Sequence, residues 1–241
     1  MEDSRQYLEQ LARTVYKHEA LNNSFYEVWM SRRLELPQVA VFVRNYGEFN
    51  RAFPEVLATV LASTKNIAAR TEYAKTLFSE MGYGDFDKVH SVLFDAWAES
   101  LAEQFGDRQK LVWANLIAEQ DALPQTFALI EGQKKLYAQD GATASGAQLA
   151  LEWQAYTMET QLYEGARKYM GMWPTKDDFH ESCEFFYAHI GAVEKEHKHE
   201  SLTAALEFDV DEASRARLLA GFNEQNRLFA EFWGAIGKTI G

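Results

Sequence analysis

Residues 90–105 read HSVLFDAWAESLAEQF, and their apolar side chains recur with the spacing of an α-helix. The recurring positions are His90, Leu93, Phe94, Trp97, Leu101 and Phe105. This pattern predicts an amphipathic helix, and it places His90 on the face that is otherwise apolar. Long stretches between the four prolines of the chain show the same spacing, so we expect an all-α fold.

Glutamates occupy inward faces of two further predicted helices. In TEYAKTLFSEMGYGD, Glu80 shares a face with Tyr73 and Leu77, and the glycines that follow are expected to end the helix. In LALEWQAYTMETQLYEGARKY, Glu159 shares a face with Leu162, although Glu152 makes the boundary of that face imprecise. Both glutamates are therefore expected to point into the bundle or nearly so.

Composition limits the classes of protein to consider. A chain of 241 residues that is 47% hydrophobic suits one domain over 1–241. Thirty-six acidic against 24 basic residues give a charge of -12 without a basic stripe, so we expect no nucleic-acid partner. The polar start lacks the features of a signal peptide and no apolar run is long enough to span a membrane, which predicts a soluble cytoplasmic protein.

The cysteine content and one polar segment add two expectations. Cys183 is the only cysteine, so the chain cannot build a thiolate zinc site or an iron–sulfur cluster. Any metal must then bind to His, Asp or Glu. The segment GQKKLYAQDGATASGAQ, residues 132–148, is poor in apolar residues in its second half, and we expect a loop or mobile element there.

Four polar residues lie on faces that otherwise look like core, namely Glu80, His90, Glu159 and His189. Each one alone is more often a hydrogen-bonded core histidine or an ion-paired glutamate than a metal ligand. Their occurrence on separate helices favours a metal site inside a bundle, because such sites take carboxylates and histidines from facing helices. The Glu-x-x-His pattern of such sites occurs at residues 194–197.

Several motifs resemble those of the haem-oxygenase-like di-iron oxidases and oxygenases, whose fold is related to the TenA-, PqqC- and CADD-like proteins. They are HEALNNSFYEVW, FPEVLATVLAS, SEMGYGDFDKVHSVLF, AYTMETQLYEGARKYMG and FFYAHIGAVEKEH, and they extend over residues 16–200. The resemblance implies a haem-oxygenase-like bundle with about seven core helices. It also implies Glu80, His90, Glu159 and His189 as metal ligands.

The last of these motifs, HIGAVEKEH at residues 189–197, departs from the family pattern His-x-x-x-Asp-x-x-His. Val193 stands at the carboxylate position, and a shift of one residue is needed to find Glu194 and His197. In a regular helix Glu194 and His197 would lie about 140° and 80° from His189. A single-residue π-bulge would bring them to about 40° and -20°, and we favour this register.

Without the bulge, the same helix would present His189, Glu196 and Glu200 instead. The bulged register makes Glu194 and His197 further ligands, and Gly191 lowers the cost of the distortion. We keep the regular register as the alternative.

The resemblance implies two Fe(II) ions per chain that activate O₂ and oxidise a small amino-acid-like or fatty-acid-like metabolite, by N-oxygenation, desaturation or oxidative C–C cleavage. A biosynthetic role, an electron donor and a homodimer would accompany such an activity. Arg70 and Arg167 are candidates for binding a substrate carboxylate, because a guanidinium pairs with a carboxylate through two hydrogen bonds. Their commoner role is that of surface arginines.

Two rival functions belong to other classes. The same fold carries metal-free enzymes, including a thiamin-degrading type with a cysteine nucleophile, for which Cys183 is the only candidate. A buried apolar role is commoner for such a residue. The chain could also be a non-enzymatic helical interaction protein in which Glu80 and Glu159 are merely ion-paired.

Overall fold

The computed structural model describes residues 2–191 and 193–241, without the side chains of residues 2 and 193–196. This part of the chain forms twelve α-helices joined by turns and short 3₁₀ segments, and it contains no strand. The α-helices are α1 (Glu2–Arg13), α2 (Ser24–Ser31), α3 (Leu36–Ser63), α4 (Ile67–Glu80), α5 (His90–Gln104), α6 (Trp113–Glu119), α7 (Pro124–Tyr137), α8 (Gly141–Ala166), α9 (Lys176–Ser182), α10 (Glu184–Ile190), α11 (Val193–Leu206) and α12 (Glu212–Ile240). The 3₁₀ segments are η1 (Thr14–Lys17), η2 (Gly82–Gly84), η3 (Phe86–Lys88), η4 (Arg108–Leu111) and η5 (Arg167–Met172). The all-α prediction is confirmed.

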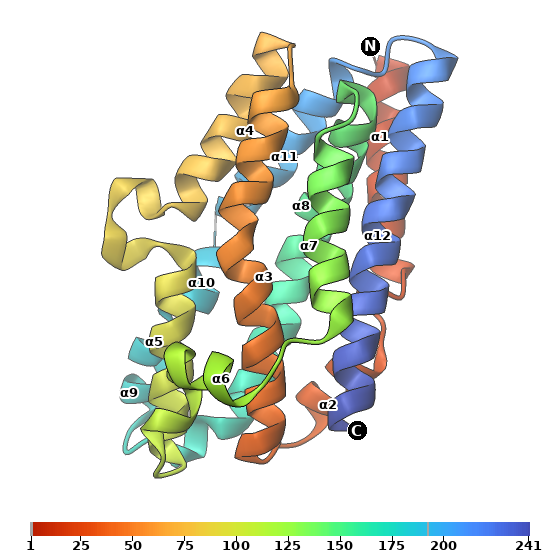
Figure 1. Ribbon diagram of the computed structural model, residues 1–241. Helices are drawn as coiled ribbons and strands as arrows, with labels where there is room; N and C mark the ends of the chain where they lie inside the picture. Colours follow the sequence, from red (N-terminus) through yellow and green to blue (C-terminus); the bar gives the residue numbers. More distant parts are fainter. Residues whose placement is uncertain (1, 192) are drawn as a thin grey trace.

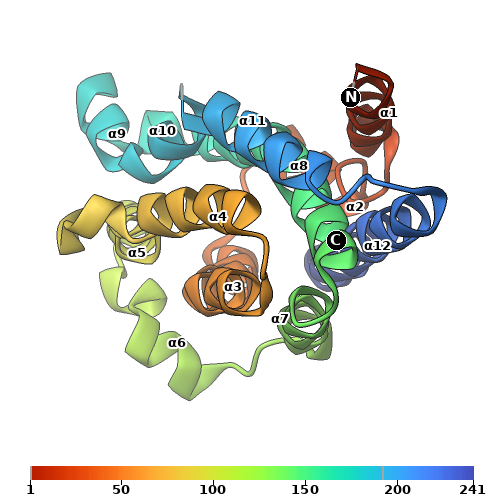
Figure 2. The same cartoon turned by 90° about the horizontal axis from the view of Figure 1, so that it is seen from above.

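Two long helices organise the bundle. Helix α3 runs through its length and contacts α4, α5, α7 and α12, and Figure 2 shows these helices grouped around it. Helix α8 packs against α12, α11, α10 and α2 on the other side (Figure 1). One continuous cluster of buried apolar residues connects the helices around α3 with those around α8, and it includes residues from Leu8 to Ile240. None of the helices in the described residues is long and apolar enough to cross a membrane.

The predicted ends of α4 and α5 agree with the structure. Helix α4 ends at Glu80, and Gly82 and Gly84 follow with positive φ angles of 63° and 89°. Glycine adopts such backbone angles without steric cost. Helix α5 then begins at His90. The connection between the two helices, residues 81–89 with η2 and η3, brings Glu80 and His90 back toward each other.

The prediction of a loop or mobile element at residues 132–148 is wrong. Only residues 138–140 lie between α7 and α8, and the small residues that follow are helical and buried. Their size allows α8 and α12 to approach closely: a Cβ on Gly146 would lie 1.9 Å from the Leu218 carbonyl oxygen, and one on Gly221 would lie 2.0 Å from that of Thr143. The low apolar content therefore reflects tight helix packing.

This close approach gives a stability prediction. Gly221→Ala should lower the free energy of unfolding by about 2–3 kcal/mol through overpacking, a fall of roughly 5–10 °C in the melting midpoint. Gly234, on the same helix, has no atom within 4 Å of a built Cβ. Gly234→Ala should instead raise the free energy of unfolding by about 0.5–1 kcal/mol through helix propensity. Thermal denaturation followed by circular dichroism measures both, and equal effects of the two changes would contradict the packing.

Candidate metal centre

Three buried donor side chains come together between α4, α5 and α10. Glu80, His90 and His189 each offer an oxygen or nitrogen, and these three atoms lie within 4.8 Å of one another. His90 Nδ1 lies 2.8 Å from Glu80 Oε2. The rings of His90 and His189 have centroids 4.3 Å apart. The structure thus brings together three of the four residues singled out by the predicted helical faces.

The helix ends around this cluster favour a bound cation. Glu80 is the last residue of α4, where the helix dipole is negative and a second negative charge is unfavourable. His90 is the first residue of α5, where the dipole is positive and disfavours a protonated imidazole. A metal ion between an ionised Glu80 and a neutral His90 would offset the unfavourable carboxylate position.

The pKa values of the cluster keep its donors ready for a metal. Burial raises the pKa of Glu80, but the charges of His90 and of the other neighbouring histidines act against it, and the pKa falls to about 2. Burial, with the nearby His90, lowers the pKa of His189 to about 3. At neutral pH the carboxylate is ionised and His189 is neutral, which are the forms that bind metals.

A backbone contact fixes the orientation of His189. Its Nδ1–H donates to the carbonyl oxygen of Phe185, one turn earlier in α10, at 2.8 Å. This contact assigns the proton to Nδ1 and leaves Nε2 as the donor atom for a metal.

Glu159 lines a cavity that Glu80 and His189 also line, but it lies outside the three-residue cluster. The hydroxyl of Tyr46, from α3, donates to its Oε1 at 2.6 Å. Burial raises the pKa of Tyr46 well above its usual value, and the charge of Glu159 adds to this effect, so Tyr46 stays a donor. The structure therefore places Glu159 at the cavity wall with one oxygen oriented by Tyr46.

A second pair of donors lies in the same cavity. His197 from α11 and Glu152 from α8 are both buried, and His197 Nδ1 lies 3.7 Å from Glu152 Oε2. Gln148 donates to Glu152 Oε1 at 2.6 Å, and Tyr137 in turn donates to Gln148 at 2.5 Å. These contacts hold Glu152 through the oxygen that does not face His197 Nδ1.

Glu152 was not among the residues proposed as ligands from the sequence, although the sequence contains its signal. It precedes Glu159 by seven residues, which in an α-helix leaves the two side chains only about 20° apart around the axis. The rise between them is about 10 Å. Two carboxylates on one face at this distance can therefore flank one cavity.

The chain between His189 and His197 is interrupted, but not by a π-bulge. Helix α10 ends at Ile190, Gly191 is extended with φ -85° and ψ -155°, and α11 begins at Val193. The expectation of one continuous helix with an extra residue is wrong, because the register changes through a full break at Gly191. Both His189 and His197 line the cavity. The side chains of Glu194 and Glu196 lie outside the described residues, so their roles stay predictions.

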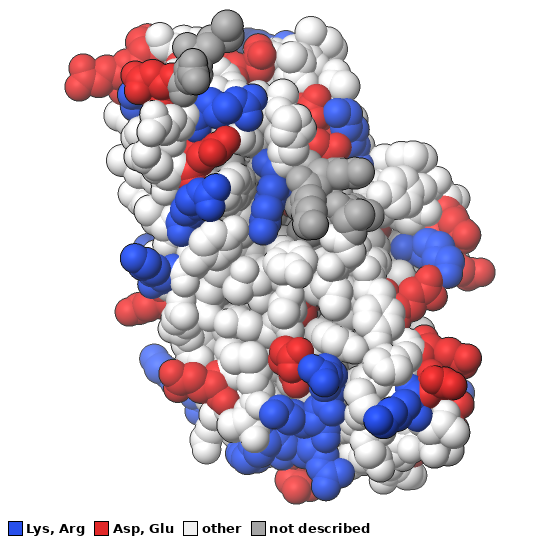
Figure 3. Space-filling model, turned by 180° about the vertical axis from the view of Figure 1, so that it is seen from behind, with Lys and Arg blue, Asp and Glu red and all other residues white. Residues whose placement is uncertain are grey.

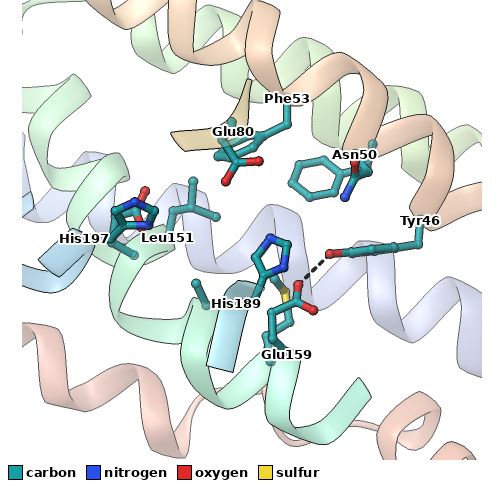
Figure 4. Close-up of a pocket in the computed structure, with 12 residues that line it drawn as sticks. Tyr46, Asn50, Phe53, Glu80, Leu151, Glu159, His189 and His197 are labelled. Atoms are coloured by element: carbon teal, nitrogen blue, oxygen red, sulfur yellow. Dashed lines mark hydrogen bonds and ion pairs between the residues drawn. The ribbon is translucent and has the colours of Figure 1, made fainter. Parts of the chain in front are cut away.

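The cavity itself is narrow and largely apolar. Figure 4 shows Glu80, Glu159, His189 and His197 converging on it from different helices. Its remaining walls are Tyr46, Phe49, Asn50, Phe53, Leu151, Glu152, Ala155 and Met158. A separate surface pocket reaches His90 from outside and is lined also by Ser79, Gly82, Tyr83, Lys88, Leu93, Glu184 and Ala188. The donor cluster thus lies between this cavity and a second pocket that reaches His90.

The two arginines proposed as substrate ligands lie elsewhere. The guanidinium of Arg70 donates to the carbonyl oxygen of Thr64 at the end of α3. Arg167 is exposed and pairs with Glu164 at 2.9 Å. Both arginines are engaged by neighbouring residues, and neither lines the cavity. Neither therefore belongs to the candidate centre.

Cys183 is also outside the cavity lining. It is fully buried, and burial raises the pKa of its thiol to about 12. A thiol with this pKa is not ionised at neutral pH, so it is a poor nucleophile. The geometry disfavours the cysteine-dependent alternative.

Comparisons with known proteins show the family to which the chain belongs. The sequence profile of a family described as iron-containing redox enzymes matches residues 40–230, and the chain belongs to that family. No curated protein matches the chain.

Solved structures show the same fold at low identity. A CADD-like protein of unknown function from Nostoc punctiforme is 15% identical, with a TM-score of 0.76 over 100% of this chain and 99% of its own. A domain of unknown function with a heme oxygenase-like fold from Shewanella denitrificans is 16% identical, with a TM-score of 0.66 over 97% and 92%. A TenA homolog from Pseudomonas syringae is 14% identical, with a TM-score of 0.68 over 96% and 91%. The predicted haem-oxygenase-like bundle is confirmed.

Proposed function

We propose that this iron-containing redox enzyme is a non-haem di-iron oxidase or oxygenase that uses O₂ to oxidise a small molecule bound in the cavity. The observation that carries the proposal is the buried set of Glu80, His90 and His189, whose donor atoms lie within 4.8 Å of one another. Two histidines and one carboxylate with open positions are the ligand set typical of non-haem Fe(II) oxygenases.

A second ion would use the other donors of the cavity. His197 and Glu152 supply an imidazole and a carboxylate at its far end, and Glu159 lies along the same wall. We assign Glu80, His90 and His189 to the first ion and His197 with Glu152 to the second, with Glu159 as the shared ligand and Glu194 as a further candidate. Two bound ferrous ions would supply two electrons to O₂.

The apolar walls of the cavity protect such chemistry from water. Phe49, Phe53, Leu151 and Met158 surround the donors and leave few polar groups to hold solvent. Asn50 is an exception: it is buried, lines the cavity, and its Oδ1 makes no hydrogen bond to another described residue. A buried polar atom of this kind needs a partner. In the proposed enzyme Asn50 orients a polar group of an otherwise apolar substrate.

Oxygen uptake tests this function directly. Protein loaded anaerobically with Fe(II) is mixed with oxygenated buffer, with and without each member of a panel of amino acids and fatty acids, and dissolved O₂ is followed with an electrode. At least one compound should accelerate uptake about tenfold or more and be recovered in oxidised form. Zn(II)-loaded protein, which cannot change oxidation state, is the control. Equal uptake by the two forms, with no compound altered, would exclude the proposed function.

A further inference from the structure

One surface of the bundle is basic although the chain carries a net charge of -12. Arg32 and Arg33 follow α2, and Arg167 and Lys168 begin η5; all four side chains are exposed. Figure 3 shows Lys and Arg side chains gathered at the lower end of the molecule in that view. We call these four residues the basic surface.

A buried tyrosine connects the two segments of the basic surface. The hydroxyl of Tyr169, the residue after Lys168, lies 2.7 Å from the backbone nitrogen of Leu34 and 3.2 Å from its carbonyl oxygen. Leu34 directly follows Arg33. The four cations are therefore held side by side by the fold.

The basic surface contains few ion pairs among the described residues. Within the described residues, Arg32, Arg33 and Lys168 form no ion pair, whereas Arg167 pairs with the neighbouring Glu164. Two other surface arginines are paired: Arg215 is held by Asp209, and Arg227 by two glutamates. The charge of the basic surface is thus left to the solvent, where it can attract an anionic partner.

Closely spaced aromatic rings lead from beneath the basic surface to the candidate centre. The ring centroids of Tyr169 and Trp29 are 5.7 Å apart, those of Trp29 and Phe42 5.0 Å, and those of Phe42 and Tyr46 5.7 Å. Tyr46 donates its hydroxyl proton to Glu159. We call Tyr169, Trp29, Phe42 and Tyr46 the aromatic path. Contiguous π-systems shorten the saturated gaps that an electron has to cross.

The packing of Trp29 fixes the middle of this path. Its Nε1 donates to the carbonyl oxygen of Leu162 in α8 at 2.8 Å. A Cβ on Gly165 would lie 1.9 Å from Trp29 Nε1, so a larger residue at position 165 would displace the indole. Glycine at this position makes room for the ring.

We propose that the basic surface is the docking site of a small acidic one-electron carrier protein, and that its electrons reach the candidate centre along the aromatic path. The proposal rests on the proposed function, because an iron centre oxidised by O₂ has to be reduced again. Each docking event oxidises one carrier and transfers one electron to the chain, so two reduced carriers are consumed for two ferric ions. No proton or group is transferred to the carrier.

Charge favours a compact protein as the partner over a more extended polyanion. Electrostatic effects between exposed charges fade over a Debye length of about 8 Å at physiological ionic strength. A small acidic protein can confine its contact to the basic surface. Nucleic acid or a membrane would extend beyond it, onto the rest of a surface in which acidic residues outnumber basic ones by 36 to 24.

Binding of a probe to the iron-free chain tests the docking site without any catalysis. The probe is a reduced plant-type [2Fe–2S] ferredoxin, and the dissociation constant is measured by calorimetry at low and high salt. The double variant Arg33→Glu/Lys168→Glu should weaken binding at least tenfold. Lys65→Glu/Lys135→Glu, which changes the net charge equally at two exposed positions elsewhere, should weaken it less than twofold. Equal losses, or no binding by the unaltered chain at low salt, would overturn the proposal.

Two further measurements separate the parts of the proposal. In iron-loaded protein, Phe42→Leu interrupts the aromatic path and should slow ferredoxin reoxidation about tenfold in stopped flow while leaving its dissociation constant unchanged. An unchanged rate would overturn the path.

The choice of partner is tested with phosphatidylserine vesicles and single-stranded DNA. If either binds the chain and ferredoxin does not, and the basic-surface variant loses this binding, the choice of an acidic carrier protein is overturned. If ferredoxin binds the chain but the iron-loaded protein takes up no O₂, the docking site is supported and the proposed function is rejected.

Discussion

Glu80→Ala should weaken Fe(II) binding to the first ion site by at least about tenfold, since even outer contacts of metal sites typically contribute 10–100-fold. Glu80 is the only carboxylate of the three-residue cluster, and His90 Nδ1 lies 2.8 Å from its Oε2. Its removal takes away the negative charge that a ferrous ion would neutralise. Anaerobic titration against a coloured iron chelator measures the affinity.

Glu72→Ala is the matched control for this change. Glu72 lies on the same helix, pairs with Lys75 at 2.7 Å, and does not line the cavity. The control should keep the affinity of the unaltered chain. Circular dichroism of both variants shows whether the fold is retained. A folded Glu80→Ala protein that binds iron as tightly as the control would remove Glu80 from the site.

Glu152→Ala should reduce the number of bound iron ions from two to one while leaving the first site occupied. Glu152 and His197 form a separate donor pair at the far end of the cavity, and Glu152 takes no part in the cluster around Glu80. His197→Ala should have the same effect, because it removes the other member of the pair. Iron content after anaerobic loading and desalting, measured by inductively coupled plasma mass spectrometry, gives the number.

The choice of residue makes this second experiment selective. Glu164→Ala, on the same helix as Glu152, serves as the control because Glu164 pairs with Arg167 and does not line the cavity. Two ions in the Glu152→Ala and His197→Ala proteins would show that the second ion uses other ligands. Loss of both ions from folded Glu152→Ala protein would show that the two sites are not separate.

The sequence predicts the first site better than the second for a physical reason. Glu80 and His90 lie at helix ends marked by local signals, namely two glycines and an apolar period, and one local connection at residues 81–89 brings them together. The second site depends on where α11 lies relative to α8, and this follows from the break at Gly191. Tertiary packing sets that geometry, and periodicity within one helix does not reveal it.

Two other differences between the predictions from the sequence and the structure also arise from tertiary packing. Residues 141–147 lack large apolar side chains, so they resemble a loop in sequence, yet their small size is what lets α8 pack against α12. Arg70 was a reasonable candidate for a substrate carboxylate, but its guanidinium is used by the carbonyl oxygen of Thr64. A hydrogen bond to a backbone atom leaves no residue-type pattern in the sequence.

We propose that the cavity lined by α3, α4, α8, α10 and α11, with His90 of α5 beside it, holds two iron ions. Anomalous diffraction at the iron absorption edge, from crystals of the chain loaded anaerobically with Fe(II), tests it most directly. We expect two iron peaks, one within bonding distance of Glu80, His90 and His189 and the other beside His197 and Glu152. No peak in the cavity of fully loaded crystals, or iron bound only at the surface, would contradict it.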